Sequence, residues 1–137
     1  MIESADTCWP TDLGWHRVIP FGGTGPLRYT RESITEKAIE KANLRIANKW
    51  LPGRMDPNRE DLRSITHVVR ELDIREDGVY AKLESLMTPA GNELAMLVNL
   101  LQGQIIFKAH CLGHAVDGLA VVEEIVSVNA QMSAEPI

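Results

Sequence analysis

The sequence predicts an α+β domain with a largely antiparallel β-sheet or barrel, two main helices and an extended N-terminal arm. Two stretches have apolar residues three to four positions apart, which is the spacing of amphipathic helices. Two strand-like runs meet at an Asp-Gly pair, a strong short-range signal for a β-hairpin. The predicted order of helix, two strands, helix and two strands lacks the regular βαβ alternation of a parallel sheet.

Length and composition fit one globular domain. The chain has 137 residues, of which 45% are hydrophobic and 24% charged. Its net charge of −5 argues against nucleic acid as a partner, because phosphate binding needs clustered Lys and Arg. No apolar run has the length of a membrane span, and the first residues lack a basic-then-apolar leader pattern. We therefore expect assembly in a cytoplasm, without a membrane partner, and with Cys8 and Cys111 as free thiols.

The first 29 residues differ from the rest in composition. Their density of proline and glycine opposes a regular helix. They also carry Trp9, Trp15 and Phe21, whereas a disordered tail is poor in large apolar groups. We expect an extended arm over residues 1–29 and a folded domain over residues 30–137. The arm either packs back on its own domain or docks on a neighbouring subunit, since aromatic anchors serve cores and interfaces alike.

A first helix is expected over residues 30–50. Ser33 and Glu36 have the spacing of a capping box, and Thr30 is a rival N-cap. The apolar stripe of this helix consists of Ile34, Ala38, Ile39, Ala42, Ile46 and Trp50. The pair Pro52-Gly53 is expected to end it.

The remainder contains a hairpin, a second helix and two further strands. The hairpin joins residues 65–74 to residues 79–86 across the Asp-Gly turn. The second helix starts with Thr88 as N-cap and Pro89 at its first position. The last two strand candidates, which a Leu-Gly break separates, are residues 105–110 and 119–128.

Several short segments follow one another in a shared order and at near-constant spacing. Among them, Ala109-His110-Cys111-Leu112-Gly113 matches the place of a Ser-Ser-Arg-Gly-Leu-Gly motif. Val126-Ser127-Val128-Asn129-Ala130 resembles a strand motif of the form Val-x-Val-Asp-Ala. The other segments are residues 27–29, 56–59, 65–72, 78–82, 88–92 and 133–136. In this order they resemble the tailed-phage prohead (capsid maturation) proteases, a family related to herpesvirus assemblin. The resemblance spans residues 27–136 and implies an assemblin-like α+β fold.

The resemblance also implies where catalytic residues would stand. The position of the serine nucleophile reads Lys108 or Ala109, and that of the aspartate reads Asn129. The position of the histidine reads Asp56, or Met55 if the loop is shifted by one residue. The arginine that helps to hold the oxyanion is replaced by His110. A serine protease needs a nucleophile, a base and a group that orients the base. We therefore expect a pseudoprotease that is not an enzyme, with no catalytic residues and no cofactor.

Two other chemistries involve Cys111. With His110 it would make a Cys-His pair, but adjacent residues of a strand point to opposite faces, and a free cysteine commonly behaves as a small hydrophobe. With His110, His114 and Asp117 it would make a metal site, but this spacing fits no standard zinc motif. We expect neither a cysteine protease nor a metal site.

The resemblance leaves three functions for a phage protein of this kind. The preferred one is a decoration or cement protein in the virion, which binds the shell of the major capsid protein through Trp9, Trp15 and Phe21. The alternatives are an internal scaffold or assembly factor, and an active prohead maturation protease with displaced catalytic residues. An unrelated α+β binding domain is a further alternative. We expect a homo-oligomer, either a dimer or a trimer.

Overall fold

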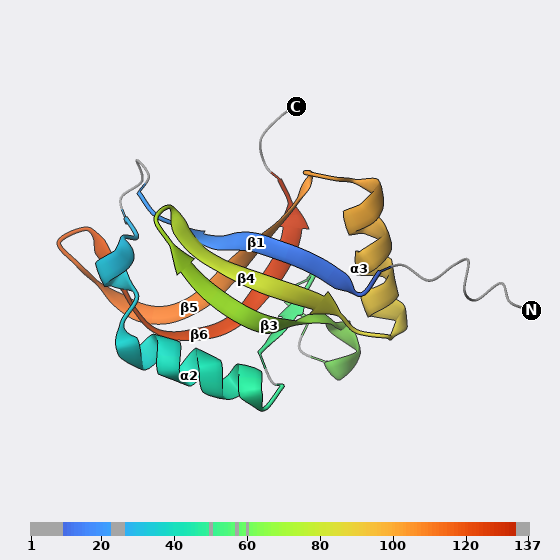
Figure 1. The fold of residues 1–137 in the computed structure, drawn as a ribbon, viewed down its shortest axis with the longest axis horizontal. Coiled ribbons are helices and arrows are strands. Elements are labelled where there is room, and N and C mark those ends of the chain that lie inside the picture. Colours follow the sequence, from blue (N-terminus) through green and yellow to red (C-terminus); the bar gives the residue numbers. More distant parts are fainter. Residues whose placement is uncertain (1–9, 23–26, 50, 57, 60, 134–137) are drawn as a thin grey trace, which may run out of the picture.

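Two antiparallel sheets form the framework of the protein (Figure 1). The computed structural model describes residues 10–22, 27–49, 51–56, 58–59 and 61–133. In that part of the chain, six strands and two α-helices are accompanied by two short 3-10 helices. One sheet has four strands and the other two, and neither closes into a barrel. The predicted α+β class with antiparallel sheets and two main helices is therefore confirmed, whereas the barrel alternative is wrong.

The four-stranded sheet has the order β1-β4-β3-β2. Its strands are β1 (Asp12–Pro20), β2 (Pro52–Arg54), β3 (Ile65–Arg75) and β4 (Gly78–Ser85). Strands β3 and β4 form the predicted hairpin. Gly78 begins β4 with φ +157°, and a Cβ there would overlap the carbonyl oxygen of Ile19. The Asp-Gly turn was a reliable signal because only glycine fits this close approach to β1.

Residues 12–20 were predicted as part of an extended arm, but they form a strand whose pairing with β4 has two register shifts. Strand β1 pairs with β4 along its length and buries Leu13, Val18 and Ile19 in the core. The proline signal failed because Pro20 is the last residue of the strand, where a missing N–H is tolerated. The alternative in which this segment packs on its own domain therefore describes residues 12–20.

The two-stranded sheet consists of β5 (Ile105–Val116) and β6 (Leu119–Met132). The Leu-Gly break predicted inside this region is wrong, because β5 continues through it with a register shift between Leu112 and Gly113. A Cβ at Gly113 would overlap the carbonyl oxygen of Val121. Glycine in a strand here accommodates a bulge in the pairing and does not end the strand.

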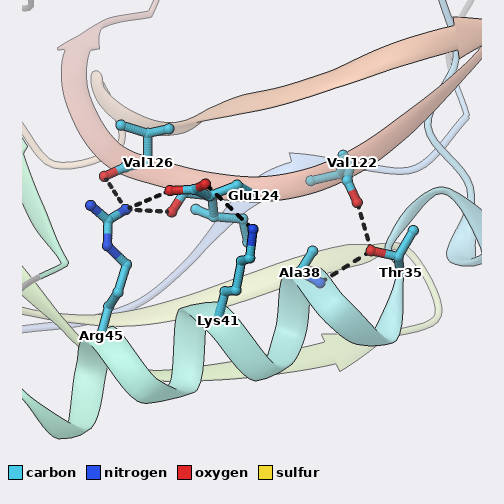
Figure 2. Close-up of polar contacts among 8 residues, drawn as sticks. Thr35, Ala38, Lys41, Arg45, Val122, Glu124 and Val126 are labelled. Atoms are coloured by element: carbon cyan, nitrogen blue, oxygen red, sulfur yellow. Dashed lines mark hydrogen bonds and ion pairs between the residues drawn. The ribbon is translucent and has the colours of Figure 1, made fainter.

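Helix α2 (Glu36–Ala47) runs along β6, and its N-cap is Thr35. The Thr35 hydroxyl accepts a hydrogen bond from the Ala38 N–H at 3.1 Å and donates one to Val122 O at 2.9 Å (Figure 2). The prediction of Ser33 as N-cap is wrong. Thr30 precedes a separate 3-10 helix. The Ser33 hydroxyl of that helix accepts a hydrogen bond from the Thr30 backbone N–H at 2.8 Å.

The first helix also ends earlier than predicted. It stops at Ala47, since Lys49 adopts the left-handed conformation with φ 58°. The pair Pro52-Gly53, predicted to end the helix, belongs to the short strand β2 (Pro52–Arg54). Trp50, expected on the apolar stripe, lies outside the described residues.

Helix α3 (Pro89–Leu100) confirms the predicted second helix. The Thr88 hydroxyl accepts from the Gly91 N–H at 3.1 Å, and proline occupies the first turn. The helix buries Leu94 and Ala95 against the four-stranded sheet. No helix in the described part of the chain is long and apolar enough to cross a membrane.

Side chains join the two sheets where β2 approaches β6. The buried His67 of β3 donates from Nε2 to Val128 O at 2.6 Å. The backbone N–H of Arg54 donates to Asn129 Oδ1 at 3.1 Å. A Cβ at Gly53 would overlap both Val128 O and the His67 ring, so glycine lets β2 and β6 approach closely.

Candidate functional site

Three of the positions that the resemblance matches to catalytic residues, Lys108, His110 and Asn129, lie on one face of the β5–β6 sheet. Lys108 is the cross-strand partner of Asn129, and His110 is the partner of Ser127. Directly opposite residues of antiparallel strands project to the same side, so these four side chains share a face. Lys108 and His110 are exposed, whereas Ser127 is 9% exposed.

This face borders a polar pocket of about 370 Å³. The side chains that line it come from α2, β2, the loop after β2, and both strands of the second sheet. The charged and polar ones are Arg45, Arg54, Arg59, His110, Ser127 and Asn129. Arginine guanidinium groups are suited to carboxylates, phosphates and other oxyanions, so the lining favours negatively charged groups.

Arg45 reaches the pocket from α2 and is held by β6 (Figure 2). Its guanidinium donates to Ile125 O at 3.0 Å and to Val126 O at 3.2 Å, and lies 3.6 Å from Glu124. Lys41, one turn earlier, lies 3.8 Å from the same carboxylate. Because these two acceptors belong to the backbone of β6, they fix the position of the guanidinium more firmly than a surface ion pair would.

Two further arginines are positioned by the segment between β2 and β3. Arg54 donates from Nε to Ser64 Oγ at 2.8 Å, while its backbone N–H binds the Asn129 carboxamide. Arg59 donates to Asp61 at 3.1 Å and is exposed. The carboxamide of Asn129 is thus oriented, with its oxygen directed at the backbone of β2.

Asp56 and Ala109 do not join this group. Asp56 is exposed in the loop after β2, where its carboxylate accepts from the Asn58 N–H at 3.0 Å, and it does not line the pocket. Ala109 packs against the hydrophobic core, on the opposite face of β5. Of the positions matched by the resemblance, the structure brings together Lys108, His110 and Asn129.

Sequence reasoning missed Ser127 and the three arginines of the pocket. Ser127 lies two residues before Asn129 in the same matched motif, and alternation along a strand places both on one face. That signal was present in the sequence. The arginines carry no comparable signal, because they come from separate elements.

Cys111 lies on the core side of β5 and is half-buried. Burial raises the pKa of its thiol to about 11, so the thiol is protonated at neutral pH. A nucleophilic cysteine needs the opposite shift. His110 points to the other face of the strand, so the adjacent residues do not form a Cys-His pair.

The described residues contain no cluster of three or more side chains suited to hold a metal ion. His114 lies 3.6 Å from the carboxylate of Glu123, and both side chains are more than half exposed. The buried His67 is engaged on both ring nitrogens, because Thr66 Oγ1 donates to Nδ1 at 2.7 Å. Burial lowers the pKa of His67 to about 4, which keeps it neutral.

The three aromatic anchors proposed from the sequence have different surroundings. Trp15 is 38% exposed on the outer face of β1. The Arg75 guanidinium carbon lies 5.2 Å from the centre of the Trp15 ring and 4.2 Å from that of Tyr80. Phe21 is half-buried against the protein's own core. Trp9 lies outside the described residues.

Comparison with known proteins gives one structural likeness. No protein-family model matches the chain, and neither does a curated protein. The chain is similar to the solved structure of the bacteriophage T4 capsid assembly protease, with a TM-score of 0.49 and 16% sequence identity. The alignment covers 92% of this chain and 94% of that one.

This finding contradicts the prediction that the chain is a pseudoprotease. The similar structure is that of an enzyme, and the described residues give no positive sign of a lost activity. The loss was inferred from Asp56, Lys108, Ala109, His110 and Asn129, each read at a position that the resemblance assigned. Reading the matched positions one by one also overlooked other polar side chains on the same face, such as Ser127.

Proposed function

We propose that this protein is a capsid protein of a tailed phage that binds the shell of the major capsid protein, as a decoration or cement protein. The observation that carries the proposal is a cluster of Trp15, Tyr80 and Arg75 on the outer face of the four-stranded sheet. Neither helix crosses this face of β1 and β4 (Figure 1). Trp, Tyr and Arg are the residue types most enriched among the energetic hot spots of protein interfaces.

Cross-strand pairing places this cluster on one face. Trp15 is opposite Lys82, and Arg17 is opposite Tyr80. The Tyr80 hydroxyl donates to the Asp77 carboxylate at 2.8 Å, and Arg17 donates to the same carboxylate at 3.1 Å. The exposed ion pair adds little stability. Side chains that are already ordered nevertheless lose less entropy when a partner binds, which favours affinity.

The surface is tested by sedimenting purified protein with empty capsid shells. Trp15→Ala should weaken binding at least tenfold, as expected for removal of an interface hot spot. Leu44→Ala is the matched control, because Leu44 is 64% exposed on α2, away from this cluster. Equal binding by both variants and the parent protein would exclude the Trp15 cluster as the binding surface.

The cement role is tested by quantitative mass spectrometry of DNA-filled particles. Intact chain at a level comparable to the coat protein is the expected result. Chain found only in empty precursors would instead support the alternative of an internal scaffold. Absence from both kinds of particle would refute the capsid proposal.

A second candidate function is that of a maturation protease with displaced catalytic residues. It is favoured by the pair Ser127 and His110, which are cross-strand partners beside the polar pocket. Such partners have Cβ atoms about 5 Å apart, within reach of a hydroxyl and an imidazole. In this mechanism His110 takes the proton of Ser127 Oγ as the oxygen attacks a peptide carbonyl, and the arginines of the pocket stabilise the oxyanion.

Labelling with a fluorophosphonate tests this candidate without knowledge of the substrate. Label located on Ser127 by mass spectrometry, absent in His110→Gln and retained in Cys111→Ala, would support the serine mechanism. No labelling of the folded parent protein would reject it.

A further inference from the structure

The β5–β6 hairpin extends beyond the four-stranded sheet at one end of the molecule (Figure 1). Its two edges differ there. On the β6 side, the Arg28 N–H donates to Gly118 O at 2.8 Å, and the Ala120 N–H donates to Arg28 O at 2.7 Å. Ile34 forms a further bridge with Val122. The segment that follows β1 therefore covers the β6 edge of the hairpin.

On the β5 side of the same hairpin, the described residues supply no strand partner. Residues 111–116 pair with β6 on one side, and in the described part of the chain no other strand pairs with them. No backbone hydrogen bond from another described segment reaches them. In an antiparallel strand, alternate residues direct N–H and C=O groups outward, so this edge presents unpaired hydrogen-bonding groups.

The composition of this edge does not protect it. Proteins commonly guard exposed edges with lysine, other charged side chains or proline. Residues 111–116 read Cys-Leu-Gly-His-Ala-Val and contain none of these apart from the weakly basic His114. Leu112 is 52% exposed and Val116 is 48% exposed. An edge that lacks lysine, proline and carboxylates, and that exposes two apolar side chains, is suited to strand addition.

We propose that this β5 edge pairs with the same edge of a second copy of the chain, antiparallel about a two-fold axis through His114. The pairing joins two hairpins into one sheet of the order β6-β5-β5-β6. A two-stranded hairpin is marginally stable by itself in water, whereas additional strands stabilise it. The contact is isologous, so the same surface satisfies both partners.

A second copy suits this edge because the sequence is self-complementary in that register. Leu112 of each copy lies opposite Val116 of the other, and Gly113 lies opposite Ala115, so that apolar pairs form on both sides of the axis. The chain has a net charge of −5, and two copies repel each other generally, but residues 111–116 carry no carboxylate. The next residue, Asp117, lies opposite Cys111 in this register.

The inference goes beyond the proposed capsid binding, because it uses a different surface. The Trp15 cluster lies on the four-stranded sheet, whereas this edge lies on the hairpin of the other sheet. A dimer of this form carries two Trp15 clusters, so it gains avidity for a repetitive shell.

Analytical ultracentrifugation of the full chain over a range of concentrations tests the dimer. The parent protein should show a monomer–dimer equilibrium, and the double variant Leu112→Lys, Val116→Lys should raise its dissociation constant at least tenfold. Leu44→Lys, at an exposed leucine of α2, is the matched control and should leave the constant unchanged. A parent protein that is monomeric at every concentration would overturn the proposal.

A disulfide test keeps the proposal falsifiable if the double variant does not fold. In a Cys8→Ser, Cys111→Ser background, His114→Cys places a thiol on the proposed axis, where two copies form a cross-link on mild oxidation. Met87→Cys in the same background is the control, since Met87 is 91% exposed and lies outside the edge. Equal cross-linking of the two variants, or none at His114→Cys, would contradict the two-fold pairing.

Discussion

Acidification should weaken the junction between the two sheets, because it adds a proton to the buried His67. The ring is neutral in the folded protein: Nε2–H donates to Val128 O, and Nδ1 accepts from Thr66. Burial lowers the pKa of His67 from 6.5 to about 4. The unfolded chain therefore binds a proton at a higher pH than the folded protein does. Stability is retained above pH 6.5 and is lost as the pH falls toward 4.

The size of this effect follows from the two pKa values. Linkage with an unfolded pKa of 6.5 and a folded pKa of about 4 predicts a loss of about 2 kcal/mol at pH 5 and about 3 kcal/mol at pH 4. The His67 side chain is fully buried, so solvent screening reduces these free-energy losses only slightly. Carboxylates also titrate in this range, so a reference variant is needed to isolate the contribution of His67.

Urea unfolding at pH 7.5, 6, 5 and 4 measures the loss. His67→Gln is the reference variant, because glutamine retains a donor for Val128 O but does not titrate. We expect the parent protein to lose about 2 kcal/mol more than His67→Gln between pH 7.5 and pH 5. His110→Gln, at an exposed position, should follow the parent protein. Parallel losses in the parent protein and His67→Gln would refute the argument.

Two further predictions concern backbone approach and thiol reactivity. Gly53→Ala should lower the free energy of unfolding by about 3 kcal/mol in urea titrations, because its Cβ overlaps the Val128 carbonyl oxygen; an unchanged midpoint would contradict the close approach of β2 and β6. Cys111 should react with iodoacetamide at pH 8 at least tenfold more slowly in the folded protein than in urea, since burial raises its thiol pKa to about 11. Equal rates, read by mass spectrometry of the Cys111 peptide, would contradict this environment.

Local signals account for the parts of the fold that the sequence predicted. The β3–β4 hairpin was found because an Asp-Gly pair fixes the turn, and α3 was found because Thr88 and Pro89 form a cap. Strand β1 was missed because its partner β4 is some sixty residues away, and its own segment is rich in proline and glycine. Strand β2 has three residues and depends on tertiary contacts, so no periodicity reveals it.

The candidate sites were predicted in part for the same reason. The matched motifs singled out Lys108, His110 and Asn129. The pairing of β5 with β6 places the side chains of these three residues on one face of the sheet. Composition pointed to Trp15 as an aromatic anchor of the arm, but its neighbours Arg75 and Tyr80 follow from cross-strand register, which the sequence does not state. Side chains that meet only through tertiary packing leave no local pattern to read.

Strand β6 has a consequence for the order of events during synthesis. It is the last strand described, yet it contacts α2, β2 and β5, and it supplies the acceptors for His67 and the Arg54 backbone. A nascent chain that still lacks residues 119–132 leaves these donors without their partners and exposes the apolar side of α2. We therefore expect the domain to stay incompletely folded until this strand has left the ribosome, which prolongs its exposure to chaperones.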